Sequence, residues 1–246
     1  MDWCEQNYAH SSYVCELFNT VSSVAMLLVG VLGLYWHRRL LEPRFSLVFG
    51  SVALVGIGSA AFHATLRFEL QMLDELPMLY TAVLLVYILV EDRPRRRFGA
   101  WFPTLLTGYA LLASYGAAFM RDRAQFFSFQ ASFTLLEFYA LYRTFCLYKR
   151  SERPVLRRAF RTGSVLYLAA MLAWFVDLRF CEQLVGASAA LGIANPQLHA
   201  WWHVLVSGGL YLLLLVILHE RLLVLGREPR WEKRFFVPML SVTPAA

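Results

Sequence analysis

Two apolar segments of the sequence contain polar side chains whose spacing is typical of a catalytic site. In "GSAAFHATLRFELQMLDELP", residues 58–77, Ser59 and His63 are four residues apart, and His199 and His203 in "HAWWH" have the same spacing. Residues four apart share one face of a helix. Three neutral imidazoles leave one position of a tetrahedral zinc ion open for water. We therefore predict a catalytic Zn²⁺ held by His63, His199 and His203.

Two further polar groups near these histidines could complete hydrolytic chemistry. Asp74 could take a proton from water and pass it to a leaving amine. Ser59, one turn before His63, could donate a hydrogen bond to an oxyanion, although a serine that only packs helices together would have the same spacing. We predict catalytic roles for Asp74 and Ser59. Glu75 points away from Asp74 on a helix, and we interpret it as a carboxylate at a helix start or cavity rim.

The rest of the sequence predicts helices that cross a membrane. Hydrophobic residues make up 59% of the 246 residues and charged residues only 16%, which is too apolar for a soluble domain. Apolar stretches near the roughly 20 residues needed to span a bilayer occur seven times. We predict an all-α, seven-transmembrane helix bundle in one domain, residues 1–246, with spans at 17–36, 45–64, 73–90, 100–120, 126–147, 163–180 and 198–219.

Basic residues predict the orientation of this bundle. Eighteen of the 23 lysines and arginines lie in alternate connections or in the tail, about 220–246, and four lie on the opposite side. Lysine and arginine favour the cytosolic side, so we predict a lumenal or extracellular amino terminus and a cytosolic tail. Because these residues explain the net charge of +6, we expect no nucleic-acid partner. The five candidate site residues then share the non-cytosolic leaflet, whereas His37 and His219 lie at the opposite end.

The motifs of this chain resemble those of the alkaline ceramidases, integral membrane amide hydrolases related to the adiponectin-type receptors. The resemblance rests on "DWCEQNY", "GIGSAAFHATL", "QMLDELPMLY", "FCEQL" and "HAWWHVL". It implies intramembrane zinc on the three histidines, with Asp74 as acid and base and Ser59 as oxyanion partner. It also implies cleavage of the amide of ceramides, including dihydro- and phytoceramides, in the endoplasmic reticulum or Golgi if the source is eukaryotic.

The amino-terminal segment, residues 1–16, is acidic and contains no lysine or arginine. Hard oxygen donors suit calcium, although a solvated acidic segment would have the same composition. The resemblance implies a structural or regulatory Ca²⁺ site and a disulfide in this region. The implied calcium ligands are the side chains of Asp2, Glu5, Asn7 and Glu16 and the carbonyl of Trp3, and the implied disulfide joins Cys4 to Cys181.

Two other functions are compatible with the same residues. The first is a lipid-sensing receptor of the adiponectin-receptor type, with only slow hydrolysis. The second is a proton or ion transporter that uses buried carboxylates. The sequence indicates no protein partner, and the membrane bilayer is the expected surrounding of the substrate.

Overall fold

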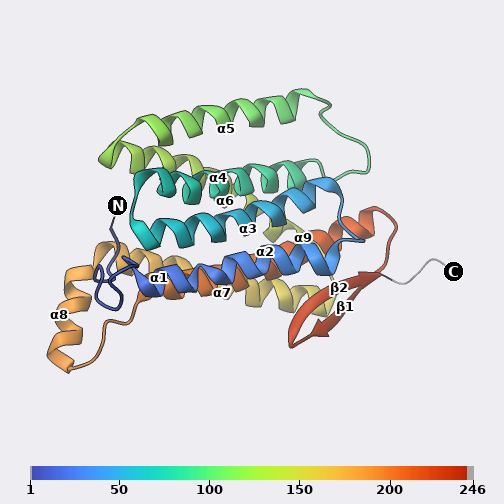
Figure 1. Ribbon diagram of the computed structural model, residues 1–246. Helices are drawn as coiled ribbons and strands as arrows, with labels where there is room; N and C mark the ends of the chain where they lie inside the picture. Colours follow the sequence, from blue (N-terminus) through green and yellow to red (C-terminus); the bar gives the residue numbers. More distant parts are fainter. Residues whose placement is uncertain (1, 243–246) are drawn as a thin grey trace.

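The computed structural model describes residues 2–242, so the last four residues of the predicted tail lie outside the described part of the chain. This part contains long, roughly parallel and antiparallel helices and one small hairpin (Figure 1). The elements are α1 Leu17–Ser22, α2 Val24–His37, α3 Pro43–Thr65, α4 Phe68–Val90, α5 Trp101–Phe119, α6 Asp122–Arg150, α7 Pro154–Arg179, α8 Cys181–Leu191, α9 Leu198–Val224, β1 Pro229–Arg234 and β2 Val237–Val242.

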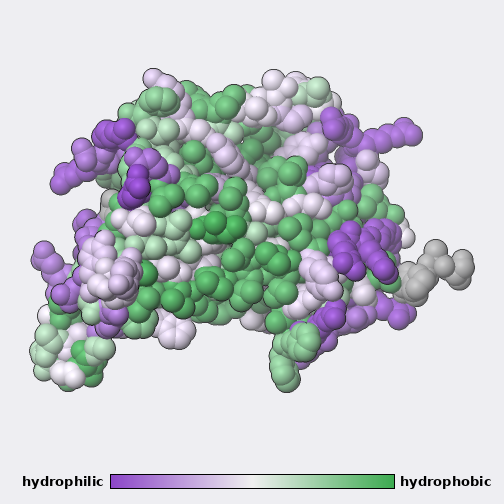
Figure 2. All heavy atoms as spheres, in the orientation of Figure 1, coloured by the Kyte–Doolittle hydropathy of each residue, from purple (hydrophilic) through white to green (hydrophobic). Residues whose placement is uncertain are grey.

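The chain is an integral membrane helical bundle. Five segments are long and apolar enough to cross a bilayer: Leu17–His37, which joins α1 and α2, and the helices α3, α4, α7 and α9. Helices α5 and α6 lie beside α4 (Figure 1). On the visible face, apolar side chains cover the middle of the molecule and hydrophilic ones gather at its two ends (Figure 2). This distribution matches a bundle surrounded by lipid.

Three elements were absent from the sequence prediction. The short helix α8 begins at Cys181, and β1 and β2 pair as an antiparallel hairpin in the tail. The described residues form an all-α fold, as predicted, with one small hairpin added in the tail. Its apolar side chains Trp231 and Leu240 pack against the ends of the long helices, so tertiary burial stabilises a hairpin that would be marginal alone.

Glycines allow the helices that carry the histidines to pack closely. A Cβ atom at Gly58 in α3 would overlap the backbone carbonyl of Leu73 in α4, and one at Gly209 in α9 would crowd the carbonyl of Gly163 in α7. Small residues at such contacts let helix backbones approach in a membrane protein, where van der Waals packing drives association. The first contact brings the start of α4 against the end of α3.

Candidate metal centre and adjoining cavity

The turn between α3 and α4 positions the first group of candidate residues. Leu66 ends α3 with a left-handed backbone, φ 51°, and α4 begins at Phe68. The sequence prediction began this helix at residue 73, so Asp74 lies nearly two turns inside α4 rather than at its start. The tight turn and the close α3–α4 contact place Asp74 beside Ser59. Both Ser59 and His63 are buried.

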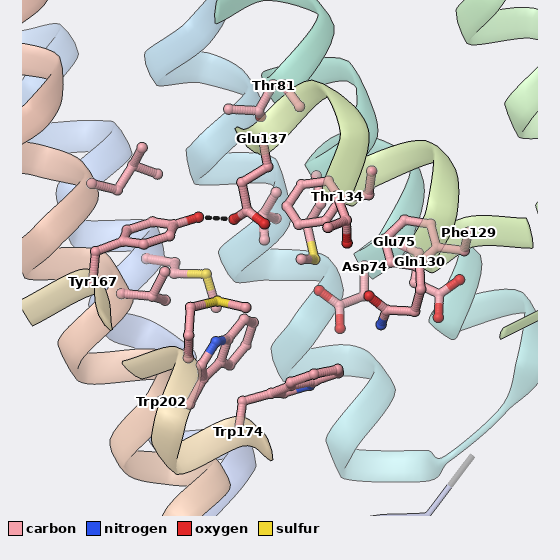
Figure 3. Close-up of a pocket in the computed structure, with 18 of the residues that line it drawn as sticks. Asp74, Glu75, Thr81, Phe129, Gln130, Thr134, Glu137, Tyr167, Trp174 and Trp202 are labelled. Atoms are coloured by element: carbon pink, nitrogen blue, oxygen red, sulfur yellow. Dashed lines mark hydrogen bonds between the residues drawn. The ribbon is translucent and has the colours of Figure 1, made fainter. Parts of the chain in front are cut away.

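An apolar cavity of about 440 Å³ lies between α3, α4, α6, α7 and α9. Most of its wall is aliphatic or aromatic, including Trp174 and Trp202. Asp74, Glu75 and His199 also line it, and Figure 3 shows the two carboxylates side by side at one part of the wall. Farther along, Tyr167 of α7 donates a hydrogen bond to Glu137 of α6. The cavity has the shape and chemistry to hold alkyl chains beside Asp74.

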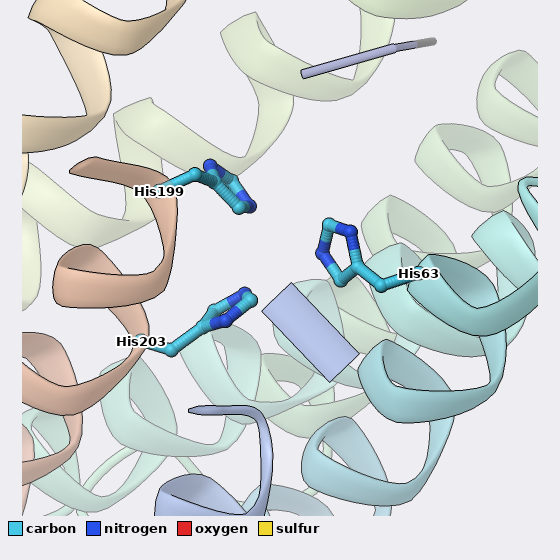
Figure 4. A group of neighbouring side chains, drawn as sticks. All are labelled: His63, His199 and His203. Atoms are coloured by element: carbon cyan, nitrogen blue, oxygen red, sulfur yellow. The ribbon is translucent and has the colours of Figure 1, made fainter. Parts of the chain in front are cut away.

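The three predicted histidines converge at the end of the bundle that includes this part of the cavity. His63 comes from α3, and His199 and His203 come from successive turns of α9. One ring nitrogen from each lies within 4.8 Å of the others, and all three side chains are buried. Their rings point toward a common centre (Figure 4). This is the geometry of a three-histidine metal site.

Hydrogen bonds orient two of these rings. The Nδ1 atom of His63 lies 2.5 Å from the Glu16 carboxylate. The Nδ1 atom of His203 lies 2.7 Å from the Ser22 hydroxyl, which itself donates to the carbonyl of Asn19. Each Nδ1 therefore donates, which places the lone pair of each ring on Nε2. The sequence analysis missed Ser22 and gave Glu16 only a calcium role, and their contacts with the histidines add a positioning role for both.

The amino-terminal segment covers the third histidine. The indole of Trp3 stacks on the His199 ring at 3.7 Å between centroids. The Asp177 carboxylate accepts the backbone N–H groups of Cys4 at 3.1 Å and His199 at 3.2 Å. Cys4 forms a disulfide with Cys181, the pair that the resemblance implied. These contacts hold the segment over the site, and Asp177 joins three parts of the chain.

The five residues implied as calcium ligands belong to this covering segment. Glu5 accepts the backbone N–H groups of Phe18 and Asn19 at the start of α1, and Asn7 donates to Asp2. Glu16 accepts the backbone N–H of Trp3. Burial raises the pKa of Asp2, Glu5 and Glu16, and the charge of Glu16 raises the pKa of the other two carboxyl groups further. A bound cation would relieve this electrostatic cost.

The remaining polar groups divide between the centre and its surroundings. The Ser59 hydroxyl accepts from Ser23 at 3.0 Å and lies 3.4 Å from Nε2 of His203. Glu75 accepts hydrogen bonds from Gln71 at 2.8 Å and Gln125 at 2.5 Å. Ser59 therefore faces the histidine centre. Glu75 lines the cavity but is held in a separate amide network.

The fold and the site define a multi-pass membrane protein with a buried three-histidine centre beside an apolar cavity. Residues 1–244 match the Ceramidase family model. The chain is 32% identical to alkaline ceramidase 3 of Mus musculus, over 94% of this chain and 86% of that relative. It is 32% identical to an alkaline ceramidase of Arabidopsis thaliana, over 86% and 79% of the two chains, and 26% identical to one of Saccharomyces cerevisiae, over 92% and 78%. The chain belongs to the ceramidase family.

Proposed function

We propose that this protein is a zinc-dependent alkaline ceramidase, which hydrolyses the amide of ceramides within the membrane to a sphingoid base and a fatty acid. The observation that carries this proposal is the convergence of three buried imidazoles beside Asp74, at an apolar cavity suited to alkyl chains. Membership of the ceramidase family and the relatives named alkaline ceramidase support the same reaction.

The donor set fits zinc. Neutral imidazoles are common zinc ligands, and the Nδ1 contacts of His63 and His203 direct the lone pair of each ring to Nε2, where a metal would replace the 3.4 Å contact of His203 with Ser59. Carboxylate and hydroxyl partners of this kind orient metal-binding histidines. The Nδ1 atom of His199 is buried without a protein hydrogen bond in the described residues. A site built from three neutral imidazole rings favours a zinc ion. The zinc ion would lower the pKa of a bound water and polarise an amide carbonyl.

Asp74 acts as the general base and then the general acid in the proposed reaction. Its carboxyl group borders the cavity from α4, on the side where the amide would meet the histidine centre. It accepts the proton of the attacking water and delivers it to the amide nitrogen, so that the sphingoid amine leaves in neutral form. Asp74 is not among the three ligand residues, which separates its role from metal binding.

Ser59 stabilises the developing oxyanion in this proposal. Its hydroxyl accepts from Ser23 and faces both Nε2 of His203 and Asp74, so its single proton lies where it could turn from these groups to a substrate oxygen. A donor placed at the developing charge acts mainly in the transition state.

The topology proposed for this chemistry has seven spans in one domain, 1–246. It includes α5 and α6 in addition to the five strongly apolar segments, with the amino-terminal segment 1–16 lumenal or extracellular and the tail from about 220 cytosolic. The distribution of arginines supports this orientation. A substrate with two alkyl chains could then react without leaving the bilayer. For a eukaryotic source, we propose the endoplasmic reticulum or Golgi membrane.

We also propose that Ca²⁺ binds between Asp2, Glu5, Asn7, Glu16 and the carbonyl of Trp3. The raised pKa values of three of these carboxyl groups support a cation there. Asp2 is the most direct probe, because it is exposed and outside the helices, whereas Glu5 also caps α1. Calcium should raise the melting temperature of the wild type but not of Asp2→Asn. Equal shifts would contradict the assignment.

A product assay tests the proposed reaction. Purified protein in nanodiscs should release a sphingoid base from ceramide, lose this activity with a zinc chelator, and regain it when zinc is restored. Mass spectrometry of both products checks the bond that is cleaved. Product formation that persists after complete metal removal would contradict the zinc-dependent mechanism, and absence of product from zinc-loaded protein would contradict ceramide hydrolysis.

A further inference from the structure

The hairpin at the end of the bundle opposite the histidines has an aromatic tip. Phe235 is 81% exposed and Phe236 is 97% exposed, and the two residues join β1 to β2. Both have positive φ values, 48° and 67°. A two-residue hairpin turn of this kind favours Asn-Gly, and bulky side chains with positive φ are outliers. Turn stability therefore does not explain two phenylalanines at this position.

Basic side chains lie along the strand that leads to the aromatic tip. Arg230, Lys233 and Arg234 are exposed on β1. The single carboxylate of the hairpin, Glu232, accepts a hydrogen bond from Ser241 on the neighbouring strand. The outer part of the hairpin thus combines a bare apolar end with a positive flank.

Contacts with the helices fix the direction of the tip. The backbone N–H of Leu240 donates to His37, and the Tyr211 hydroxyl donates to the Pro238 carbonyl at 2.8 Å. The turn between the strands points back beside the helical bundle rather than away from it (Figure 1). In the same view, an apolar projection stands out below the molecule at this end, next to hydrophilic groups (Figure 2). The hairpin therefore holds its tip beside the lipid-facing surface.

We propose that Phe235 and Phe236 insert into the membrane leaflet at this end, while Arg230, Lys233 and Arg234 bind the phosphates of anionic phospholipids. Aromatic side chains concentrate at membrane interfaces, and basic residues near a membrane surface are attracted to anionic headgroups. Exposed aromatic side chains beside basic ones indicate a tip that binds lipid, whereas basic side chains alone would indicate a charged, solvated hairpin. It is separate from the histidine centre and requires no hydrolytic activity.

Lipid contact can be measured at the tip directly. Cys15 and Cys146 are outside the disulfide, and only Cys15 is buried, so labelling uses a Cys146→Ser background. A bimane label at Phe236→Cys in this background should be quenched by brominated lipids in nanodiscs. The matched label at Glu232→Cys, which lies on the exposed flank, should be quenched much less. Replacing Arg230, Lys233 and Arg234 by glutamine should reduce the quenching at 236 by anionic brominated lipid. The proposal would be overturned if the label at residue 236 were quenched no more than the label at residue 232. It would also be overturned if quenching at residue 236 by anionic brominated lipid were the same with and without the three basic side chains.

The double variant F235N/F236G separates lipid binding from hairpin folding. Asn-Gly suits the turn, so the melting temperature should equal or exceed that of the wild type. In nanodiscs that contain phosphatidylglycerol, trypsin should cleave the hairpin about tenfold faster in this variant, because two apolar side chains no longer hold it in lipid. Equal cleavage rates would overturn the proposal. Wild-type protection that grows with protein concentration instead of anionic lipid content would also overturn it, in favour of self-association.

Discussion

Buried histidines lie at both ends of the helical bundle, but their ring nitrogens meet different groups. At the hairpin end, Nε2 of His37 accepts the backbone N–H of Leu240 at 3.1 Å, and Nδ1 of His219 accepts the indole N–H of Trp231 at 2.9 Å. In each ring a protein donor occupies a lone pair that a metal would need. These two histidines attach the hairpin to the bundle.

At the other end, the ring nitrogens have the opposite arrangement. The Nδ1 atoms of His63 and His203 contact Glu16 and Ser22, so acceptors fix the rings and the lone pair of each lies on Nε2, where His203 has only a 3.4 Å contact with the Ser59 hydroxyl. One nitrogen of each ring converges with a nitrogen of His199. The comparison teaches that the partner of the second ring nitrogen, rather than burial alone, distinguishes a histidine that could bind metal from a structural one.

The strongest test of this distinction compares His63→Ala with His37→Ala. We expect His63→Ala to lose bound zinc and almost all ceramide hydrolysis, because a three-ligand site loses one ligand. His37→Ala should retain zinc but lose about 1–3 kcal/mol of stability, because the Leu240 N–H is left without its acceptor. Elemental analysis and thermal unfolding measure the two effects. Full zinc occupancy in His63→Ala would contradict the assignment of the centre.

The next test separates chemistry from metal binding at two adjacent carboxyl groups. Asp74→Asn should keep zinc but reduce hydrolysis by about 10²–10⁴-fold, because a general acid and base is lost. Glu75→Gln is the matched control, since one of the two amides that donate to Glu75, Gln71 or Gln125, can flip to accept from the new NH2 group, and the loss of activity should be much smaller. Rates and zinc content are measured on the same preparations. Zinc loss in Asp74→Asn would show that Asp74 belongs to the ligand set.

Much of this site could be predicted from sequence because its signals are local. The four-residue spacing of His199 and His203 indicates one helix face, and the arginine distribution brings His63 to the same end of the bundle. The helix ranges followed from runs of about 20 apolar residues. Such signals depend on neighbouring residues or on composition, so they can be recognised without knowledge of tertiary contacts.

The parts that sequence missed depend on distant contacts. Ser22 is 181 residues from His203, its partner in the structure. Asn19, Ser22 and Ser23 lie at helical spacing within an apolar span. This spacing indicates in the sequence that one face of the helix contacts polar groups. The hairpin was missed for a different reason. Its turn is Phe-Phe rather than Asn-Gly, and its stability comes from packing against the helices.

A smaller effect should follow at the partner of His203. Ser22→Ala removes the acceptor of the Nδ1–H group and should weaken zinc affinity about 10–100-fold, as is typical when a residue that orients a metal-binding histidine is lost. Ser22→Thr keeps the hydroxyl and should restore most of the affinity. Trp231→Phe provides the comparison at the other end, because it removes the donor to His219 and should leave zinc affinity unchanged. Zinc competition titrations would contradict the positioning role if Ser22→Ala binds like the wild type.

The smallest expected effect concerns ion pairs at the hairpin end. Arg221 donates to both oxygens of Glu42, at 2.6 and 2.9 Å, and these hydrogen bonds lower the pKa of Glu42 below its ordinary 4.5. The unfolded chain therefore binds a proton more readily at this group. Its stabilising contribution is present above pH 4.5 and is lost as the pH falls through the lower folded-state pKa.

Glu42→Gln should consequently lower the melting temperature at neutral pH and make it fall less steeply below pH 4.5 than in the wild type. Glu228→Gln is the matched control. It breaks the exposed pair with Arg153, which water screens, and it should change the melting temperature little at either pH. Melting curves at several pH values check both variants. If the two variants have the same pH profile, burial of Arg221 does not distinguish the Glu42 pair from a surface ion pair.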